Sequence, residues 1–316
     1  MGGRAYETIL VTGAAGFVGE HLLAHLARAD DRPERIVALD LAAADGDEAE
    51  SVACDLTDRR AAAAAIAAAR PDGIIHLAGV ADGSDAGVYF DVNVAACENV
   101  LAAAAGLSKR PRVLVTGSAA QYGVTTGSHE VVDESRPLLG ATPYALSKTL
   151  QERWALAGST WRDVPVVCVR PFNIMGPGQP RRLVPAAFLH QVAAVLDGRA
   201  EGLCVGNTAT SRDFIDARDV AAAMWALMCA DERADGQAFN IATGRPTKIQ
   251  DLLAACIECA GREIPVRHDP SRLRAVDVPV IVGDATKLRE LTGWRERIDW
   301  RRSLADMWER IKPPGP

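Results

Sequence analysis

Tyr144 and Lys148, in the segment TPYALSK, are well suited to proton-transfer chemistry. They are four residues apart in a predicted helix over 143–157, so they lie on one face of that helix. A free phenol has a pKa of about 10, and a nearby ammonium group favours the phenolate. Ser118, in VTGSAAQYG, ends a predicted strand and would hold the same reacting oxygen by a hydrogen bond. Taken alone, a Tyr and a Lys at this spacing are more often a surface pair than a catalytic pair. A catalytic role is therefore inferred only from their combination with other motifs.

A glycine-rich motif, TGAAGFVG, places Gly13, Gly16 and Gly19 directly after the first predicted strand and into the first predicted helix. Glycine suits a tight turn, a close approach of the backbone to a pyrophosphate, and a helix that packs closely on a strand. The spacing differs from GxGxxG by one residue, and glycines also occur in ordinary turns. We predict a bound dinucleotide, whose nicotinamide would be a second cation near Tyr144. Lowering the phenol pKa to about 7 requires roughly 4 kcal/mol, which two close cations can supply.

Asp40 closes the second predicted strand, about 20 residues beyond the glycines, where its carboxylate can accept hydrogen bonds from the adenosine ribose. A 2'-phosphate would meet this negative charge, so the sequence favours NAD over NADP. A polar residue that merely ends a strand is the alternative. Asp55 and Leu56 follow a third short apolar run and could hold the adenine edge. An acid that caps the next helix explains Asp55 equally well.

Short aliphatic runs alternate with alanine-rich stretches from residue 8 to about residue 170, which is typical of a parallel sheet covered by helices. The predicted strands are 8–12, 35–40, 73–77, 112–117 and 164–170. The predicted helices are 17–29, 59–70, 86–106 and 143–157. The fold class is therefore α/β, a doubly wound parallel Rossmann sheet with its ligand crevice at the carboxyl ends of the strands.

A cluster of prolines and glycines, at Pro171, Gly176, Pro177, Gly178 and Pro180, interrupts this alternation. We predict a dinucleotide-binding domain over 1–172 and a smaller, mainly substrate-binding lobe over 173–316. A helix near 216–231 and a strand over 238–242 would return to the first domain. Residues 208–243 are therefore predicted to belong to that domain, so that the two lobes interleave along the chain.

Composition excludes several classes of protein. The chain has 316 residues, 48% of them hydrophobic and 24% charged, as in an ordinary globular protein. Its net charge of -6 gives no electrostatic basis for binding nucleic acid. The longest uncharged apolar run, 61–69, is too short to span a bilayer, which takes about 20 residues. The start of the chain has no room for a signal peptide, so we expect a cytoplasmic protein without a membrane partner.

The motifs together resemble an extended short-chain dehydrogenase/reductase of the nucleotide-sugar epimerase/dehydratase family, over nearly the whole chain. The segments that carry the resemblance are TGAAGFVG, HLAG, DVNV, GSAAQYG, PYALSK, RPFNIMGPGQ, SRDFIDARDV and RLRAVDVPVIVGD. The resemblance implies that Ser118, Tyr144 and Lys148 form the catalytic set. The expected cofactor-binding residues are Gly13, Gly16, Phe17, Val18, Gly19, Asp40, Asp55, Leu56, Leu77, Ala78, Gly79, Asn93, Tyr144, Lys148 and Pro171.

The resemblance also implies a nucleotide-diphosphate sugar as substrate. Arginine suits a diphosphate because its forked donors stay charged and engage two oxygens. Arg212 and Arg274 match the arginines that the family uses for this purpose. Asn173 matches a side chain often found near the substrate, where Ser118 would also bind.

The reaction must be argued from the site, because the family performs several on one fold. In its 4,6-dehydratases, acidic residues follow the catalytic Ser or Thr; here Ala119 and Ala120 follow Ser118. We therefore expect no dehydratase activity. A 4-epimerase with retained NAD is favoured over an NAD(P)H-dependent reductase of a 4-keto-6-deoxy sugar, although the second half is similar to reductases of GDP-4-keto-6-deoxymannose. A non-catalytic NAD sensor is a third alternative, which requires the catalytic set to be idle.

Two further features admit simple interpretations. Cys256 and Cys259 form a CxxC motif inside a predicted helix, and no further zinc ligands are evident at suitable spacing, so we interpret them as a buried or half-buried pair and predict no metal site. The helices near 86–106 and 143–157 could pair across a two-fold axis, as in dimers of the family. We expect a homodimer, although composition does not exclude a monomer.

Overall fold

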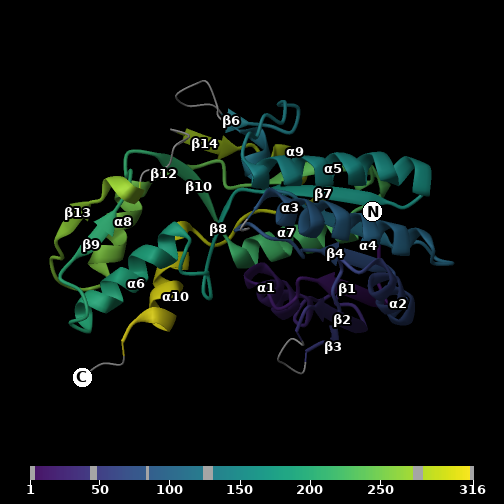
Figure 1. Ribbon diagram of the computed structural model, residues 1–316, viewed down its shortest axis with the longest axis horizontal. Helices are drawn as coiled ribbons and strands as arrows, with labels where there is room; N and C mark the ends of the chain where they lie inside the picture. Colours follow the sequence, from purple (N-terminus) through teal and green to yellow (C-terminus); the bar gives the residue numbers. More distant parts are fainter. Residues whose placement is uncertain (1–3, 43–47, 83–84, 124–130, 273–279, 314–316) are drawn as a thin grey trace.

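The computed structural model describes residues 4–42, 48–82, 85–123, 131–272 and 280–313 (Figure 1). Its larger lobe is built on a seven-stranded sheet in the order β11-β7-β5-β4-β1-β2-β3, and every neighbouring pair of strands is parallel. The strands are β1 Thr8–Thr12, β2 Arg35–Asp40, β3 Glu50–Ala53, β4 Gly73–His76, β5 Arg112–Thr116, β7 Val166–Pro171 and β11 Gln237–Ile241. The prediction of a doubly wound parallel sheet is confirmed.

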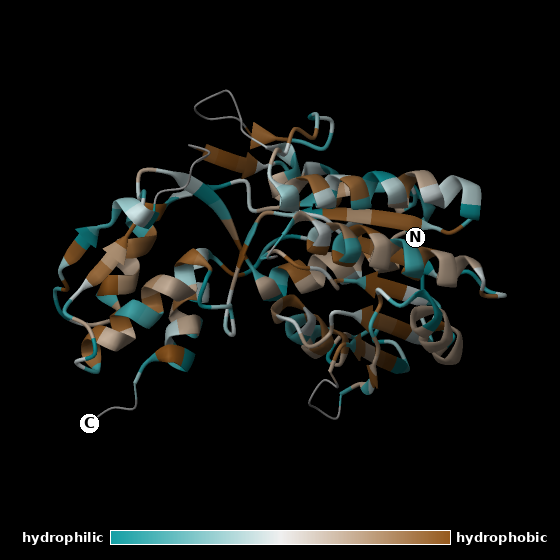
Figure 2. Cartoon of the chain, viewed as in Figure 1, coloured by the Kyte–Doolittle hydropathy of each residue, from teal (hydrophilic) through white to brown (hydrophobic). Residues whose placement is uncertain are grey.

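Helices cover both faces of this sheet, which explains why its central strands are continuous apolar runs. Ile9 and Val11 of β1 point to one face, where they share a core with α1 and α7. Leu10 points to the other face, where it shares a core with α2, α4 and α5. Figure 2 shows the brown, apolar strands between the helices. The bounds are α1 Phe17–Leu26, α2 Arg59–Ala69, α4 Ala96–Ala105, α5 Pro143–Arg162 and α7 Ala217–Cys229.

The helix predicted over 86–106 is not continuous. It consists of α3 Ala86–Tyr89, a π-helical segment η1 Phe90–Ala95, and α4. A π-helical turn inserts an extra residue and rotates the side chains that follow it. The consequence is that Asn93 in η1 lies fully buried. The edge strand β3 was not among the predicted strands: it has only four residues, and three of them are exposed.

The smaller lobe, on the left in Figure 1, has its own apolar core, which includes Phe188, Leu189, Leu252 and Met307. Its elements are α6 Val184–Leu196, β9 Leu203–Val205, α8 Ile249–Glu258, β13 Val266–His268 and α10 Trp300–Ile311. Strands β9 and β13 pair in parallel.

Short strands join the two lobes: β6 Val131–Val132, β8 Asn173–Met175, β10 Ser211–Asp216, β12 Pro246–Lys248 and β14 Val280–Gly283. From β10 the chain re-enters the larger lobe, where α7 packs on α1 and β11 pairs with β7. The remaining elements are η2 Ala119–Tyr122, η3 Glu232–Ala234, η4 Pro270–Arg272 and α9 Thr286–Thr292. Among the described residues, no helix combines the length and apolarity needed to cross a membrane. The domain limits 1–172 and 173–316 stay a prediction.

Candidate active site

The predicted site residues gather at the carboxyl ends of neighbouring strands. Gly13 follows β1, Leu77 follows β4 and Ser118 lies just beyond β5. In the sheet β1 lies between β2 and β4, and the strand order reverses there. A reversal of this kind leaves a crevice outside the strand ends, where ligands bind to doubly wound sheets. The sheet order therefore brings the glycine loop and the catalytic candidates to one crevice.

The glycine loop fits a dinucleotide. Gly13 has φ +68°, and a Cβ built on it would lie 2.6 Å from the backbone N of Ala78, so only glycine fits between the two loops. A Cβ on Gly19 would lie 2.4 Å from the backbone oxygens of Gly13 and Ala14. Gly16 caps α1 without a side-chain bond, which leaves the first N–H groups of the helix available for an anion. Phe17 packs edge-on against His21, and Val18 packs on the core.

Asp40 holds its carboxylate against this loop. It accepts hydrogen bonds from the backbone N–H groups of Ala15, at 3.0 Å, and Leu41, at 2.7 Å. A negative charge is thus fixed beside the place where a ribose would follow the pyrophosphate. Asp55 accepts hydrogen bonds from the backbone and hydroxyl of Thr57, which lower the pKa of its carboxyl, while Leu56 is buried.

Asn93 fixes the loop that follows β4. Its side-chain oxygen accepts from Val80 N at 2.8 Å, and its amide nitrogen donates to Val80 O and to the hydroxyl of Ser147 on α5. Ala78 N donates to the Thr12 hydroxyl. Asn93 therefore holds Leu77, Ala78 and Gly79 against both β1 and α5. The predicted contact of Asn93 with the coenzyme stays a prediction, because both amide hydrogens already have partners.

The side chains of Ser118 and Tyr144 face each other in the crevice. Burial raises the pKa of Tyr144 above its usual value, and the neighbouring Ser118 hydroxyl opposes the rise. The Tyr89 ring of α3 lies beside Tyr144, with 6.2 Å between the ring centroids. In the protein alone the phenol is thus protonated at neutral pH, and Lys148 does not lower its pKa as the sequence suggested.

Lys148 is fully enclosed at the base of the same crevice. Its Nζ donates to Thr116 O and to Gln151 Oε1, both at 2.9 Å. A Cβ on Gly79 would lie 3.1 Å from this nitrogen, so the ammonium also lies close to the loop after β4. Burial lowers the pKa of Lys148 to about 8, so it is mostly charged at pH 7.

The predicted substrate residues come from the strands between the lobes. Asn173 begins β8, which pairs with β10, the strand that carries Arg212. One Arg212 nitrogen donates to Ser211 O. Pro171 ends β7 opposite Ile241. Arg274 lies outside the described residues.

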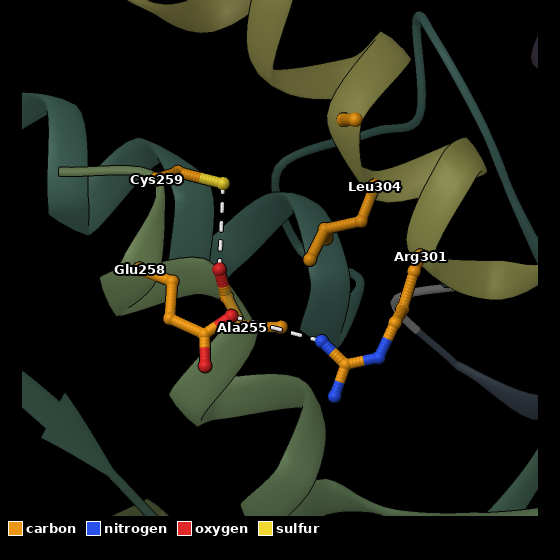
Figure 3. A pocket seen from close by; sticks show the side chains of 6 residues that line it. Ala255, Glu258, Cys259, Arg301 and Leu304 are labelled. Carbon is orange, nitrogen blue, oxygen red and sulfur yellow. Dashed lines mark hydrogen bonds and ion pairs between the residues drawn. The ribbon is translucent and has the colours of Figure 1, made fainter. Parts of the chain in front are cut away.

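Cys256 and Cys259 are placed in the smaller lobe, away from the strand ends. Cys256 is buried and Cys259 half-buried, as interpreted from the sequence, and burial raises the pKa of both thiols. Figure 3 shows Cys259 in a small pocket between α8 and α10, where Arg301 and Glu258 form an ion pair of 3.6 Å. No cluster of three metal-ligating side chains occurs within the described ranges.

A model of the NAD dependent epimerase/dehydratase family matches residues 9–242. The chain belongs to this family. It is 30% identical over 309 residues to the GDP-6-deoxy-D-mannose reductase of Pseudomonas aeruginosa, covering 94% of this chain and 95% of that protein. The solved structure of RMD from Pseudomonas aeruginosa complexed with NADPH has a TM-score of 0.83 and 27% identity, covering 97% of this chain and 99% of that one. The structure of a UDP-glucose 4-epimerase from Thermus thermophilus in complex with NAD has a TM-score of 0.84 and 26% identity, covering 96% and 98%.

Sequence reasoning missed Gln151, which holds Lys148, and Gln121, which holds the backbone of Ser118. Gln151 gives no signal beyond its place three residues after Lys148. Gln121 does: it follows Ser118 by three residues, which is the spacing of a capping box.

Lys148→Met should change how stability depends on pH. The folded protein holds Lys148 with a pKa of about 8, against 10.5 for a free lysine, so the unfolded state binds more protons between these values. Wild-type stability then rises with pH in this window. The wild type should gain about 2 kcal/mol relative to Lys148→Met between pH 7 and 9.5, measured by urea unfolding of coenzyme-free protein.

Lys109→Met is the matched control, because the exposed Lys109 pairs with Asp72 and its pKa is raised rather than lowered. The free energy of unfolding of the wild type should not rise relative to that of Lys109→Met between pH 7 and 9.5. Parallel profiles for wild type and Lys148→Met would contradict the buried charge.

Proposed function

We propose that this protein is an NAD-dependent 4-epimerase of nucleotide-diphosphate sugars. The observation that carries the proposal is the placement of Ser118 beside Tyr144, with the buried Lys148 one turn further along the same helix, at the strand ends beside the glycine loop. The two residues after Ser118 are alanines, which have no acid or base for removal of water. Ser118, Tyr144 and Lys148 are sufficient for proton transfer at one hydroxyl-bearing carbon. A reaction that requires an additional acid or base, such as dehydration, is not supported by these residues.

Each residue has a distinct task in the proposed reaction. Tyr144 takes the proton of the C4 hydroxyl and later returns it to the ketone oxygen, while Ser118 holds that oxygen by a hydrogen bond. NAD, when bound, accepts a hydride and gives it back. Lys148 places a buried positive charge in the crevice. Since it does not lower the phenol pKa in the protein alone, a positively charged nicotinamide would have to be bound before the phenolate is favoured. The keto sugar must turn its other face before the hydride returns, since otherwise the substrate is regenerated.

Arg212 is the described residue that we assign to the diphosphate, with Asn173 on the neighbouring strand near the sugar. A guanidinium stays charged at all relevant pH values and engages two phosphate oxygens. Arg274 is assigned to the same diphosphate on the sequence alone.

A reductase of a 4-keto-6-deoxy sugar is the second candidate. It is favoured by the 30% identity with GDP-6-deoxy-D-mannose reductase over nearly the whole of both chains. The same three residues would serve it, with Tyr144 as proton donor only. The two functions differ in the coenzyme: a reductase consumes NADH or NADPH, whereas the epimerase regenerates NAD in every cycle.

This difference gives a direct test. Purified protein should interconvert C4 epimers of a UDP-, GDP-, ADP-, CDP- or dTDP-sugar without added coenzyme, as resolved by chromatography. Tyr144→Phe should reduce turnover by about 10²–10⁴-fold, because it removes the proton-transfer group, and should keep bound NAD. Consumption of reduced nicotinamide in proportion to product would establish the reductase instead. Undiminished turnover by Tyr144→Phe would refute both.

Asp40 is the basis for proposing NAD rather than NADP. Asp40→Asn keeps an oxygen for only one of the two N–H groups of Ala15 and Leu41, which donate to different carboxylate oxygens, and it removes the negative charge. We expect NAD to bind roughly 10-fold more weakly and NADP more tightly, since a charge-assisted hydrogen bond contributes about 1.5–3 kcal/mol. Calorimetry with both coenzymes measures this. An unchanged ratio of the two affinities would remove Asp40 from the ribose site.

We also propose that two copies pair through α5. Leu146, Leu150 and Trp154 are spaced by four residues and are 52%, 42% and 44% exposed, which makes a continuous apolar stripe. Phe90 of the adjoining η1 is 52% exposed. Across a two-fold axis, the stripe of one copy can pack against the same stripe of the second copy, so that both stripes are buried.

Leu150→Glu should weaken such a dimer by at least about 100-fold, because a carboxylate in a desolvated interface is left without a partner. Sedimentation velocity over a concentration series measures the change. Val266→Glu, at an exposed apolar residue of β13 in the other lobe, is the matched control and should leave association unchanged. A monomeric wild type, or a Leu150→Glu variant that still dimerises, contradicts the interface.

A further inference from the structure

A chain of buried polar side chains runs beneath Ser118 from the end of β5 to α5, β7 and β11. Its members are Gln121, Glu152, Arg170, Tyr122 and Asn240, and each is almost completely buried. Buried polar groups cost free energy unless they are satisfied, and a fully satisfied network fixes a unique geometry. The part nearest the proposed reaction centre consists of Gln121 and Glu152.

Gln121 is bonded at both ends of its amide. Its Oε1 accepts a hydrogen bond from the backbone N–H of Ser118 at 2.7 Å, and its Nε2 donates to Glu152 Oε2 at 2.9 Å. The Ser118 hydroxyl in turn accepts from Ala120 N at 3.2 Å, which completes a capping box around η2. A Cβ on Gly117 would lie 2.3 Å from Gln121 Oε1, so the amide occupies the space that a side chain at residue 117 would need.

Glu152 is held from the opposite side by Arg170 of β7. The two groups form a bidentate ion pair, with Nε to Oε2 at 2.8 Å and Nη2 to Oε1 at 2.6 Å. The side chains of Arg170 and Glu152 are only 6% and 3% exposed. Arg170 also donates to the Tyr122 hydroxyl, which donates to Asn240 Oδ1 on β11. A buried ion pair is weak evidence for stability, because desolvation offsets the attraction, but it does fix geometry.

The two linked residues belong to the two elements that carry the reacting groups. Gln121 follows Ser118 by three residues, and Glu152 follows Lys148 by four and Tyr144 by eight on α5. Resting on the function proposed above, we propose that Gln121 and Glu152 are positioning residues, which hold the loop of Ser118 in register with the helix of Tyr144. They set the position of the Ser118 hydroxyl relative to the phenol and touch neither substrate nor coenzyme.

A neutral amide meets both demands at residue 121 at every pH. Its carbonyl accepts from Ser118 N, and its NH₂ donates to a carboxylate. A methionine of similar size would bond to neither, and a glutamate would oppose its charge to that of Glu152. A displacement of about 1 Å in a reacting group can cost roughly 10²-fold in rate. We therefore expect loss of the Gln121 amide to lower kcat and to leave ligand binding nearly unchanged.

The test is a double-mutant cycle between Gln121→Met and Ser118→Ala. Gln121→Met should lower kcat by about 10- to 100-fold while KM and NAD affinity stay within about 2-fold. Once the Ser118 hydroxyl is absent its position no longer matters, so the double variant should be no slower than Ser118→Ala alone.

Gln179→Met is the matched control. Gln179 is also buried and uses both ends of its amide, donating to Ile174 O and accepting from Ala186 N, in another part of the molecule. It should lower the melting temperature to a similar degree, and its effect on kcat should multiply with that of Ser118→Ala.

Multiplicative effects of Gln121→Met and Ser118→Ala would overturn the positioning role. If Gln121→Met does not fold, Gln121→Glu replaces it: a protonated carboxyl can accept from Ser118 N and donate to Glu152, whereas an ionised one repels Glu152. Its activity relative to the wild type should then fall as pH rises from 6 to 9, and a constant ratio would overturn the proposal. Failure of the proposed function is distinct, because the wild type would then show no epimerisation without added coenzyme, whichever residue occupies position 121.

Discussion

The burial of Lys148 is the constraint on which the candidate site depends. Its ammonium is bonded to a backbone carbonyl and an amide oxygen, and none of the carboxylates in the described ranges forms an ion pair with it. Burial without a counter-ion lowers its pKa to about 8, which corresponds to a cost of about 3 kcal/mol at neutral pH. The fold tolerates that cost, and an unneutralised cation results. A cation paired with a carboxylate would contribute little net charge to the crevice.

Arg170 is a buried cation whose charge is neutralised. It lies on β7, the strand next to β5, to which Lys148 is bonded. Glu152 neutralises its guanidinium with two hydrogen bonds, and Tyr122 takes a third. Lys148 is part of α5, and Arg170 is bonded to Glu152 on the same helix. Arg170 thus has a carboxylate partner, whereas Lys148 has none among the described residues. The compensated pair lies below the site and holds its elements together. The uncompensated cation lies in the crevice, where charge can serve the reaction.

The sheet, and the placement of the main candidate residues at its strand ends, were predictable from the sequence because they depend on local patterns. The run ILV after Thr8 and the glycines after Thr12 specify β1 and the loop that follows it, and the spacing of Tyr144 and Lys148 specifies one helical face. The π-helical segment η1 and the link from Gln121 to Glu152 were not predictable. Asn93 is buried because of bonds to Val80 and Ser147, and Gln121 meets a residue 31 positions away. Such partners are decided by tertiary packing, on which a single sequence carries no periodic signal.

An enzyme that retains its coenzyme must keep its lobes together around the glycine loop, and the structure provides contacts of this kind. His21 of α1 shares a hydrogen bond of 2.9 Å with Pro177 O in the segment between β8 and α6. A Cβ on Gly176 would lie 3.7 Å from the Phe17 ring at the start of the same helix. The segment after β8 therefore packs on the helix whose N-terminus faces the proposed pyrophosphate site. The two lobes are thereby linked beside the glycine loop, an arrangement that an epimerase and a reductase could both use.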